Sequence, residues 1–319
     1  MSVIFFSIII VNYNTRDLLR SCLKSIRMDI HPLSLEIIVV DNHSSDGSTD
    51  MLRQEFPAVA VIENTDNLGF SKACNQGIRA SRGRYIILLN SDTELLPDTL
   101  ESLGRLLVQE LPNSIAGIVG CRLMNPDGSL QYSTGNFPSL WSTIRDMFRP
   151  RHLRKYDLTG YDHAHDVDWV TGAFLLIRRS VVEDIGLLDE RFFMYYEEVD
   201  WCLRARKRGW SVLYDPTTSI IHKAPLASKK NRINLKIVIE VRRSHLYYFR
   251  KNRGIAEFVA VACATLFLLL VKRTRWDLSF FAHPDVRSKN REEAGVLLSS
   301  VWVAFRELIS DPTIGKTTS

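Results

Sequence analysis

Four short stretches of Ile, Val and Leu in the first third of the chain each end in a cluster of polar, turn-forming residues. The stretches are 7–11, 37–40, 59–62 and 86–89. Continuous apolar runs of this length are typical of strands in a parallel sheet that is covered on both faces. Residues 15–28 lie between the first two and carry apolar side chains at helical spacing, with Asn14 or Thr15 as the N-cap. The alternation of strands and helices predicts an α/β domain.

The polar residues that follow these strands are candidates for ligand binding. They include Asn12, Asp41, Asn67 and Asp92. Because the carboxyl ends of parallel strands meet at one edge of a sheet, we expect these side chains to converge on one crevice. A carboxylate such as Asp92, directly after a buried strand, can hold a divalent cation that neutralises a diphosphate. Taken alone, an Asn-x-Asp segment is more often a surface turn.

Residues 113–235 read as a mixed second half. We predict strands near 115–123 and 169–178, a helix near 197–208, and a long loop over 133–168 that shapes an acceptor site.

Three acids stand at the start of the predicted helix, directly after four aromatic residues. The acids are Glu197, Glu198 and Asp200, and the aromatic residues are Phe192, Phe193, Tyr195 and Tyr196. One interpretation is an ordinary acidic helix start paired with Arg204. The other is a partly desolvated carboxylate that serves as a general base.

His222 follows another apolar stretch. A single His is more often structural than a ligand, but this position makes it a candidate nitrogen ligand to the same cation as Asp92.

The cysteines and the chain start agree with a globular protein of a reducing compartment. Hydrophobic residues make up 45% of the 319 positions, enough for a packed core. The five cysteines are scattered singly, with no disulfide or zinc spacing. The apolar start lacks a basic segment and a cleavage site, so we interpret it as a buried first strand rather than a leader.

The last part of the chain is basic and contains an apolar run. Residues 236–319 hold 14 Lys and Arg against 8 Asp and Glu, whereas the whole chain has a net charge of only +5. The run at 258–271 has 14 residues, fewer than the roughly 20 that a spanning helix needs. Basic and aromatic residues flank it. This favours a helix attached to an anionic membrane surface over a nucleic-acid partner; a buried core helix with solvated basic ends is the alternative.

The strand-end segments and the acidic helix form an ordered set of motifs. They are Ser7-Ile-Ile-Ile-Val-Asn12-Tyr13-Asn14, Val39-Val40-Asp41-Asn42 with Asp46-Gly47-Ser48, Asn64-Thr-Asp-Asn67-Leu-Gly69-Phe70, Leu-Leu-Asn90-Ser-Asp92, and Trp169-Val-Thr-Gly172-Ala continuing through Glu-Glu-Val-Asp to His222. In this order they resemble the family 2 glycosyltransferases of the GT-A fold over residues 5–225. Within that family the chain is most similar to bacterial rhamnosyltransferase-type enzymes that build cell-wall or surface polysaccharides on a lipid carrier.

The resemblance implies a GT-A, Rossmann-like domain over 1–235, with a nucleotide-binding half (1–112) and an acceptor-binding half (113–235). Residues 236–319 would form a mainly helical, membrane-associating tail. Asn12, Tyr13 and Asp41 would hold the base and ribose of a nucleoside-diphosphate sugar, with Asn67 nearby.

The resemblance also implies the catalytic groups. Asp92 would bind Mg²⁺ or Mn²⁺ and the donor diphosphate, with His222 as a further metal ligand. Glu198 would be the general base, with Glu197 and Asp200 beside it in the substrate site. The sequence departs from the family at two positions: Asn90 replaces the first acid of the Asp-x-Asp motif, and Glu198 stands where the family more often has Asp.

These roles together imply an inverting transfer to a hydroxyl group. The resemblance implies dTDP-rhamnose as the donor and a glycan or a polyprenyl-diphosphate-linked sugar as the acceptor, used at the cytoplasmic face of the cell membrane. Another hexosyl or GlcNAc transferase and a non-catalytic nucleotide-sugar-binding protein are alternatives. The loop Asn12-Tyr13-Asn14 contains no glycine, which argues against a sugar nucleotidyltransferase or a dinucleotide-dependent oxidoreductase.

Overall fold

The computed structural model describes residues 4–26, 34–110, 114–147, 155–223, 235–277 and 284–311. The chain folds into two compact units. Unit 1 comprises Met1–Phe137, Tyr156–Phe193 and Glu197–Leu226, and unit 2 comprises Pro138–Lys155, Met194–Tyr196 and Ala227–Ser319. Unit 2 therefore contains the predicted tail and, in addition, residues 138–155, 194–196 and 227–235, which the sequence had assigned to the acceptor-binding half.

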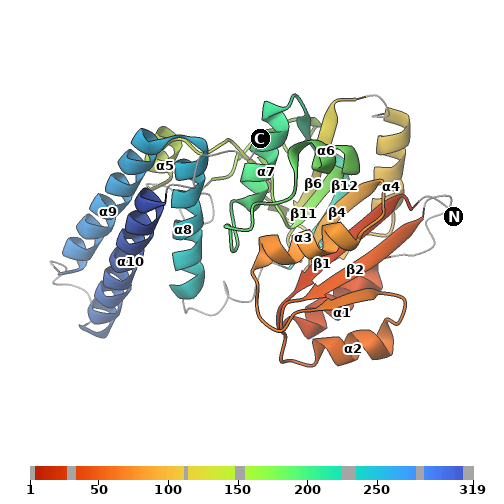
Figure 1. Ribbon diagram of the computed structural model, residues 1–319, viewed down its shortest axis with the longest axis horizontal. Helices are drawn as coiled ribbons and strands as arrows, with labels where there is room; N and C mark the ends of the chain where they lie inside the picture. Colours follow the sequence, from red (N-terminus) through yellow and green to blue (C-terminus); the bar gives the residue numbers. More distant parts are fainter. Residues whose placement is uncertain are drawn as a thin grey trace. The chain divides into compact units, whose positions relative to one another are not determined.

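Unit 1 is built on one mixed sheet with the main strand order β3-β2-β1-β4-β11-β6-β12-β5 (Figure 1). The strands are β1 Phe6–Asn12, β2 Leu35–Asp41, β3 Ala60–Glu63, β4 Tyr85–Asn90, β5 Thr93–Leu95, β6 Ala116–Met124, β11 Phe174–Arg178 and β12 Ser211–His222. Two short strands, β7 Leu130–Gln131 and β9 His165–Asp166, pair with β6 and β12. Strands β1 to β4 are parallel, whereas β11 runs antiparallel to β4 and β6.

Helices cover both faces of the parallel part of the sheet, as the continuous apolar strands predict. Ile8 and Ile10 of β1 pack in one core cluster with Leu19 of α1, whereas Ile38 of β2 packs with Ala73 of α3 in another. The helices of unit 1 are α1 Arg16–Ser25, α2 Ser48–Glu55, α3 Phe70–Ala80, α4 Thr99–Arg105, α6 Arg179–Ile185 and α7 Glu197–Lys207, with a π-helical turn at Leu106–Glu110. This arrangement leaves the strand ends as the place where polar side chains gather.

The register of the parallel strands brings their carboxyl ends level. Asn12 at the end of β1 is paired with Asp41 at the end of β2, and Val11 is paired with Asn90 at the end of β4. The predicted α/β class and the common edge of the strand ends are therefore confirmed.

The second half departs from the sequence prediction at 133–168. This segment is not one long loop, because it contains β8 Thr134–Gly135, α5 Leu140–Met147 and β9. Strand β8 pairs with β10 Trp169–Val170, and α5 belongs to unit 2. Residues 148–154 lie outside the described part of the chain.

Unit 2 is helical, with α8 Leu235–Asn252, α9 Ile255–Asp277 and α10 Pro284–Ser310 side by side and α5 against α9 (Figure 1). The Leu140 backbone N–H at the start of α5 donates to Glu257 Oε1 of α9 (2.8 Å). The packing of α5 on α9 explains why the segment around it joins unit 2.

Helix α9 contains the apolar run 258–271 and buries only one of its faces. Phe258, Val261 and Leu269 are buried in unit 2, whereas Phe267 is 65% exposed and Leu270 50% exposed. The alternative of a buried core helix does not hold for the whole run, because one face is core and the other is open. Attachment of the open face to a membrane surface stays a prediction. Among the described residues, we find no helix with the length and apolar character needed to cross a bilayer.

Candidate active site

The ends of β1 and β2 are joined by a buried pair of polar side chains. Asn12 Nδ2 donates hydrogen bonds to Asp41 Oδ1 (2.7 Å) and to Ser44 Oγ (3.0 Å). Asp41 Oδ2 accepts from the Ser44 backbone N–H (2.8 Å). Asn12 is fully buried and Asp41 is nearly so. The Asn12 amide is therefore used inside the protein, where it holds the Asp41 carboxylate in place.

Thr15 connects this pair to the end of β4. Its hydroxyl donates to Asn12 Oδ1 (2.6 Å) and lies 2.8 Å from Ser91 Oγ. Thr15 occupies the predicted N-cap position of α1, but its side chain makes no capping bond to the helix. It instead joins the ends of two neighbouring strands, directly beside Asp92.

Asn67 is positioned through Asn42, whose role the sequence motif alone does not indicate. Asn42 Nδ2 donates to Asn67 Oδ1 (3.1 Å) and to the Gly69 carbonyl (3.1 Å), and its Oδ1 accepts from the Leu68 N–H (3.1 Å). Asn42 is 2% exposed. One buried amide thus ties the loop before α3 to the end of β2.

Gly69 is required where this loop meets the segment before α7. Its φ is +85°, and an added Cβ would lie 2.6 Å from the Phe193 carbonyl oxygen. The Phe70 N–H donates to that carbonyl (2.6 Å). Any larger residue at Gly69 would push the two segments apart.

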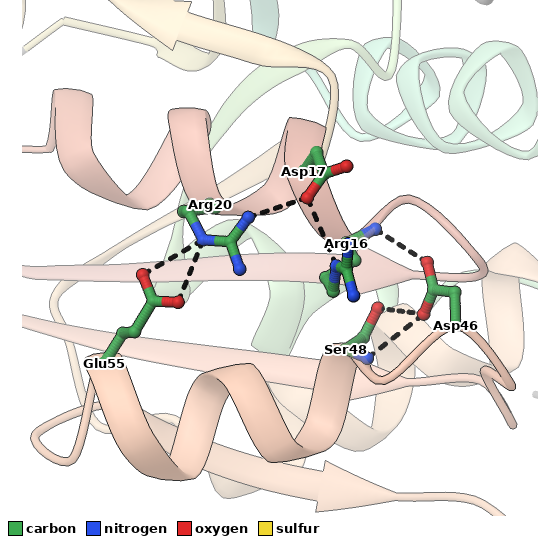
Figure 2. Close-up of polar contacts among 6 residues, drawn as sticks. All are labelled: Arg16, Asp17, Arg20, Asp46, Ser48 and Glu55. Atoms are coloured by element: carbon green, nitrogen blue, oxygen red, sulfur yellow. Dashed lines mark hydrogen bonds and ion pairs between the residues drawn. The ribbon is translucent and has the colours of Figure 1, made fainter.

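The loops after β1 and β2 are held by the helices that follow them. Figure 2 shows Asp46 accepting hydrogen bonds from the Arg16 backbone N–H (2.8 Å) and from Ser48. Partial burial acts to raise the pKa of Asp46, but these hydrogen bonds outweigh it and the pKa is lowered. Within this braced frame the Tyr13 side chain is 49% exposed, so it can offer its ring to a ligand.

Asp92 and His222 meet where β5 pairs with β12. Thr93 is opposite His222 in the register, and the Lys223 N–H donates to the Asp92 carbonyl (2.8 Å). His222 Nε2 lies 3.2 Å from Asp92 Oδ1, and both side chains are 14% exposed. His222 Nε2 is buried and makes no hydrogen bond, whereas Nδ1 lies 2.5 Å from Gln131 Oε1. No sequence motif identifies Gln131 as part of this site.

These two side chains fit a divalent cation. Two ligand atoms that are each about 2.1 Å from a cation, and about 90° apart as seen from it, lie about 3 Å from each other. The separation of Asp92 Oδ1 and His222 Nε2 is close to that value. The described residues contain no cluster of three or more His, Cys, Asp or Glu side chains suited to a metal. Mg²⁺ commonly takes only one or two protein ligands and completes its shell with water and phosphate oxygens, so a two-residue site suits a nucleotide-bound cation.

The three acids of α7 are all buried, but they face different partners. Asp200 is fully buried and its Oδ2 accepts from Arg204 Nε (2.9 Å), and Arg204 in turn donates to the Leu187 carbonyl (2.7 Å). Glu197 lies close enough to Cys74 of α3 for its charge to add to burial in raising the pKa of that thiol. We therefore assign Asp200 to a structural ion pair and leave it out of the substrate site proposed below.

Glu198 faces the loop that leads into β11. A Cβ at Gly172 would lie 4.0 Å from Glu198 Cβ and 3.7 Å from the Phe70 ring. The next residue, Ala173, accepts a hydrogen bond from the Asn90 N–H (3.1 Å) at the end of β4. Glu198 thus flanks a loop that is bonded to the strand carrying the Asn-Ser-Asp motif.

The predicted wall of four aromatic rings before α7 is divided between the two units. Phe192 and Phe193 belong to unit 1, and Phe193 is 39% exposed. Tyr195 and Tyr196 belong to unit 2, where the Tyr196 ring packs on His245.

Comparison with solved structures places the fold among the GT-A glycosyltransferases. A mannosyltransferase from Pyrobaculum calidifontis, solved with GDP-Man and Mn²⁺, aligns with a TM-score of 0.52 at 17% identity, covering 96% of this chain and 78% of the other. GalNAc-T7 with UDP, GalNAc and Mn²⁺ aligns with a TM-score of 0.56 at 16% identity, covering 98% of this chain and 58% of the other. The GT-A fold predicted from the sequence is confirmed.

Sequence comparison finds relatives among named glycosyltransferases. An N-acetylglucosaminyl-diphospho-decaprenol L-rhamnosyltransferase of Mycobacterium tuberculosis is 30% identical over 209 residues, and the match covers 59% of this chain and 66% of that protein. The low-salt glycan biosynthesis hexosyltransferase Agl10 of Haloferax volcanii is 29% identical, over 75% of this chain and 74% of that protein. The family model for glycosyl transferase family 2 matches residues 7–186. On this match, which spans more than half of its length, the chain belongs to glycosyl transferase family 2.

Proposed function

We propose that this chain is an inverting glycosyltransferase that moves a sugar from a nucleoside-diphosphate donor to a hydroxyl group in polysaccharide synthesis. The observation that carries the proposal is the pairing of Asp92 Oδ1 with His222 Nε2 at 3.2 Å, beside the strand ends that Asn12 and Asp41 hold together. Two side chains that can hold a divalent cation lie next to a polar edge that is already formed. Such a cation can neutralise the charge of a diphosphate leaving group.

The nucleotide would lie along the ends of β1 and β2. The half-exposed Tyr13 ring would stack on the base, and Asp41 would accept hydrogen bonds from ribose hydroxyl groups with the remaining capacity of its carboxylate. Asn12 would act indirectly, by holding Asp41. Asn67 would line the same edge from the loop that Asn42 fixes.

Transfer would be a single displacement. Glu198 would take the proton of the acceptor hydroxyl as that oxygen attacks the anomeric carbon from the face opposite the leaving group, so the configuration inverts. Mg²⁺ or Mn²⁺ held by Asp92 and His222 would neutralise the charge of the departing diphosphate. Glu197, on the Cys74 side of α7, would support the position of Glu198.

For the donor and acceptor, we infer L-rhamnose from dTDP-rhamnose and a glycan or a polyprenyl-diphosphate-linked sugar. The mycobacterial relative is named for rhamnosyl transfer to such a lipid-linked acceptor. The haloarchaeal relative is named as a hexosyltransferase, which keeps another hexosyl or GlcNAc donor as the second candidate. A non-catalytic nucleotide-sugar-binding protein is a third.

Unit 2 would attach the enzyme to the cytoplasmic face of the membrane. Phe267 and Leu270 present apolar side chains on the open face of α9, and Lys272 and Arg273 follow them in sequence. A sequence in which exposed apolar residues are followed by basic ones suits the interface of an anionic bilayer.

The function is tested with a panel of dTDP-rhamnose, UDP-GlcNAc, UDP-galactose and GDP-mannose, scored by slow donor hydrolysis with Mg²⁺ or Mn²⁺. One donor should be hydrolysed well above the others, and Asp92→Ala should abolish both metal-dependent hydrolysis and transfer to a lipid-linked acceptor. Full activity in EDTA would remove the metal from the proposal. Binding of a donor without hydrolysis or transfer would favour the non-catalytic alternative.

The membrane role is tested by Phe267→Ser with Leu270→Ser on the open face of α9. The double variant should remain folded but no longer bind vesicles containing anionic lipid, whereas the wild type binds them. Ser299→Ala, at an exposed polar position of α10, is the matched control. Undiminished vesicle binding by the double variant would place the attachment elsewhere.

A further inference from the structure

The two ring nitrogens of His222 have different surroundings. Nε2 is buried, makes no hydrogen bond and lies 3.2 Å from Asp92 Oδ1, whereas Nδ1 lies 2.5 Å from Gln131 Oε1. A neutral imidazole binds a cation through the nitrogen that carries no proton. Nε2 can therefore serve as a metal ligand only if the ring proton is on Nδ1.

The direction of the hydrogen bonds beyond Gln131 follows from one carboxylate. Asp127 Oδ1 has no hydrogen to donate, so it accepts the hydroxyl hydrogen of Ser129 (2.6 Å). Having donated its only hydrogen, Ser129 Oγ must accept from Asn125 Nδ2 (2.9 Å). The Leu130 carbonyl accepts from the same Nδ2 at 3.4 Å. Asn125 is thereby oriented with its Oδ1 toward Gln131.

The orientation of Asn125 fixes that of Gln131, and through Gln131 the position of the proton on the His222 ring. Asn125 Oδ1 accepts from Gln131 Nε2 (3.0 Å), which turns Gln131 Oε1 toward His222. An amide oxygen can only accept, so the hydrogen in the bond between Gln131 and His222 belongs to Nδ1 of the ring. The Nε2 lone pair is then left facing Asp92.

The backbone keeps this chain of bonds in place. Residues 125–129 form a turn closed by the Asn125 N–H to the Ser129 carbonyl (2.8 Å) and the Gly128 N–H to the Asn125 carbonyl (2.9 Å). Gln131 is opposite Leu123 in the pairing of β7 with β6, and Leu123 is opposite Ile220 in the pairing of β6 with β12. One sheet thus carries both Gln131 and His222.

We propose that Gln131 is a positioning residue that fixes His222 as the tautomer with its proton on Nδ1, and that the surface turn 125–129 sets the orientation of the Gln131 amide. The consequence for metal binding rests on the proposed function, in which His222 is a ligand. The tautomer itself does not. Hydrogen-bonded partners of metal-binding histidines commonly set ring orientation and strengthen binding roughly 10- to 100-fold.

The first measurement is the ¹⁵N NMR spectrum of the histidine-labelled, metal-free protein at pH 8, with the His222 signals identified by their loss in His222→Gln. We expect a protonated Nδ1 and an unprotonated Nε2 in the wild type. In Gln131→Leu, which has no acceptor for Nδ1, the proton should move to Nε2, where Asp92 accepts it. Asn125→Asp should keep the wild-type pattern, because a carboxylate at this position still accepts from Gln131.

The second measurement is Mn²⁺ binding in the presence of nucleoside diphosphate, followed by the EPR signal of free Mn²⁺. Gln131→Leu should weaken binding roughly 10- to 100-fold. Asn125→Asp and the control Gln54→Leu, at an exposed position of α2, should bind as the wild type does. Circular dichroism checks that each variant is folded.

A wild-type His222 with a proton on Nε2, alone or together with Nδ1, would overturn the proposal, as would an unchanged tautomer in Gln131→Leu. If the tautomers are as expected but the wild type binds no Mn²⁺, the metal role in the proposed function fails and the role of Gln131 in setting the tautomer stands.

Discussion

Two edges of the proposed site differ in how their buried polar groups are satisfied. We call the ends of β1 and β2, proposed to bind the nucleotide, the nucleotide edge, and Asp92 with His222, proposed to bind the cation, the metal edge. At the nucleotide edge, Asn12, Asp41 and Ser44 bond to one another. At the metal edge, His222 Nε2 is buried without a hydrogen bond beside the Asp92 carboxylate. The first edge is complete without a ligand, and the second has an atom whose bonding a ligand would complete.

This difference predicts that substitutions at the two edges have different consequences for stability. Removing one partner of a buried, satisfied pair leaves the other without its bond and costs about 1–3 kcal/mol of stability. Removing a group that binds only substrate or metal costs activity and leaves the free energy of unfolding almost unchanged. Substitutions of the groups proposed to bind the metal or act in catalysis should therefore lower activity without lowering stability, whereas substitutions at the nucleotide edge should lower both.

The largest effect is expected for Glu198→Gln, which keeps the size of the side chain and removes its ability to accept a proton. Transfer should fall by about 10²- to 10⁴-fold, the range for losing a general base, while donor binding and the melting temperature are maintained. Steady-state kinetics with the active donor measures the rate of transfer, and calorimetry measures donor binding and the melting temperature.

Glu197→Gln is the matched control for this variant. It changes the neighbouring buried acid, which lies toward Cys74, and should be much milder. Equal losses in both variants would mean that both acids act or that the start of α7 is disturbed. A product with the donor's anomeric configuration, or an undiminished rate in Glu198→Gln, would contradict the role of Glu198.

An intermediate effect is expected for Asn12→Ala at the nucleotide edge. The substitution removes the 2.7 Å hydrogen bond to a carboxylate that is 2% exposed, so we expect the free energy of unfolding to fall by about 1–3 kcal/mol. Chemical denaturation measures this change. Donor affinity should fall as well, because Asp41 loses the group that holds it.

Asn136→Ala provides the control for Asn12→Ala, because Asn136 makes the same kind of bond to Asp157 (2.6 Å) at an exposed position. Its loss should cost under about 0.5 kcal/mol, as is usual for surface substitutions. If the buried and exposed variants lose the same stability, the nucleotide edge is not the rigid frame that we describe.

The two edges also differ in how far the sequence predicts them. The nucleotide edge is predictable because each apolar strand ends at its polar residue, and parallel strands of similar length bring Asn12 and Asp41 level without further information. At the metal edge, the pairing of Asp92 with His222 follows from the family resemblance. Gln131 does not, because it reaches His222 from 91 positions away through the registers of β7, β6 and β12.

Two other differences from the prediction depend on packing that the sequence pattern does not specify. Helix α5 resembles part of a loop in sequence, and its place in unit 2 depends on a bond to Glu257, 117 positions away. Asp200 looks equivalent to Glu198 in sequence, but its carboxylate forms an ion pair with Arg204, one helical turn later. Only the orientation of α7 separates these two acids, and a sequence pattern does not specify that orientation.

The smallest effect concerns His245 of α8, which extends the comparison to a second buried histidine. Its Nε2 lies 3.3 Å from Thr143 Oγ1, and the ring packs against Tyr196 and Phe249. Burial, with a smaller contribution from Arg242, lowers the pKa of His245 from 6.5 to about 3. Its Nε2 lies beside a hydroxyl group, whereas Nε2 of His222 lies beside the Asp92 carboxylate, so we expect a purely structural role for His245.

The lowered pKa of His245 determines how its contribution to the free energy of unfolding changes with pH. In the unfolded chain His245 binds a proton near pH 6.5, whereas in the folded chain it binds one only near pH 3. The contribution of the neutral His245 to stability is therefore complete above pH 6.5 and is lost as the pH falls toward 3. One proton changes the free energy of unfolding by about 1.4 kcal/mol per pH unit. Between pH 8 and pH 5.5, the wild type should therefore lose about 1.4 kcal/mol more than His245→Gln, whose amide keeps a bond to Thr143 but does not titrate. Denaturation of both proteins at the two pH values measures the difference, and transfer at pH 8 should be equal in the two. An equal pH dependence would mean that His245 is hydrated in the folded protein, and a loss of transfer at pH 8 would mean that the helices of unit 2 contribute to the reaction as well as to attachment.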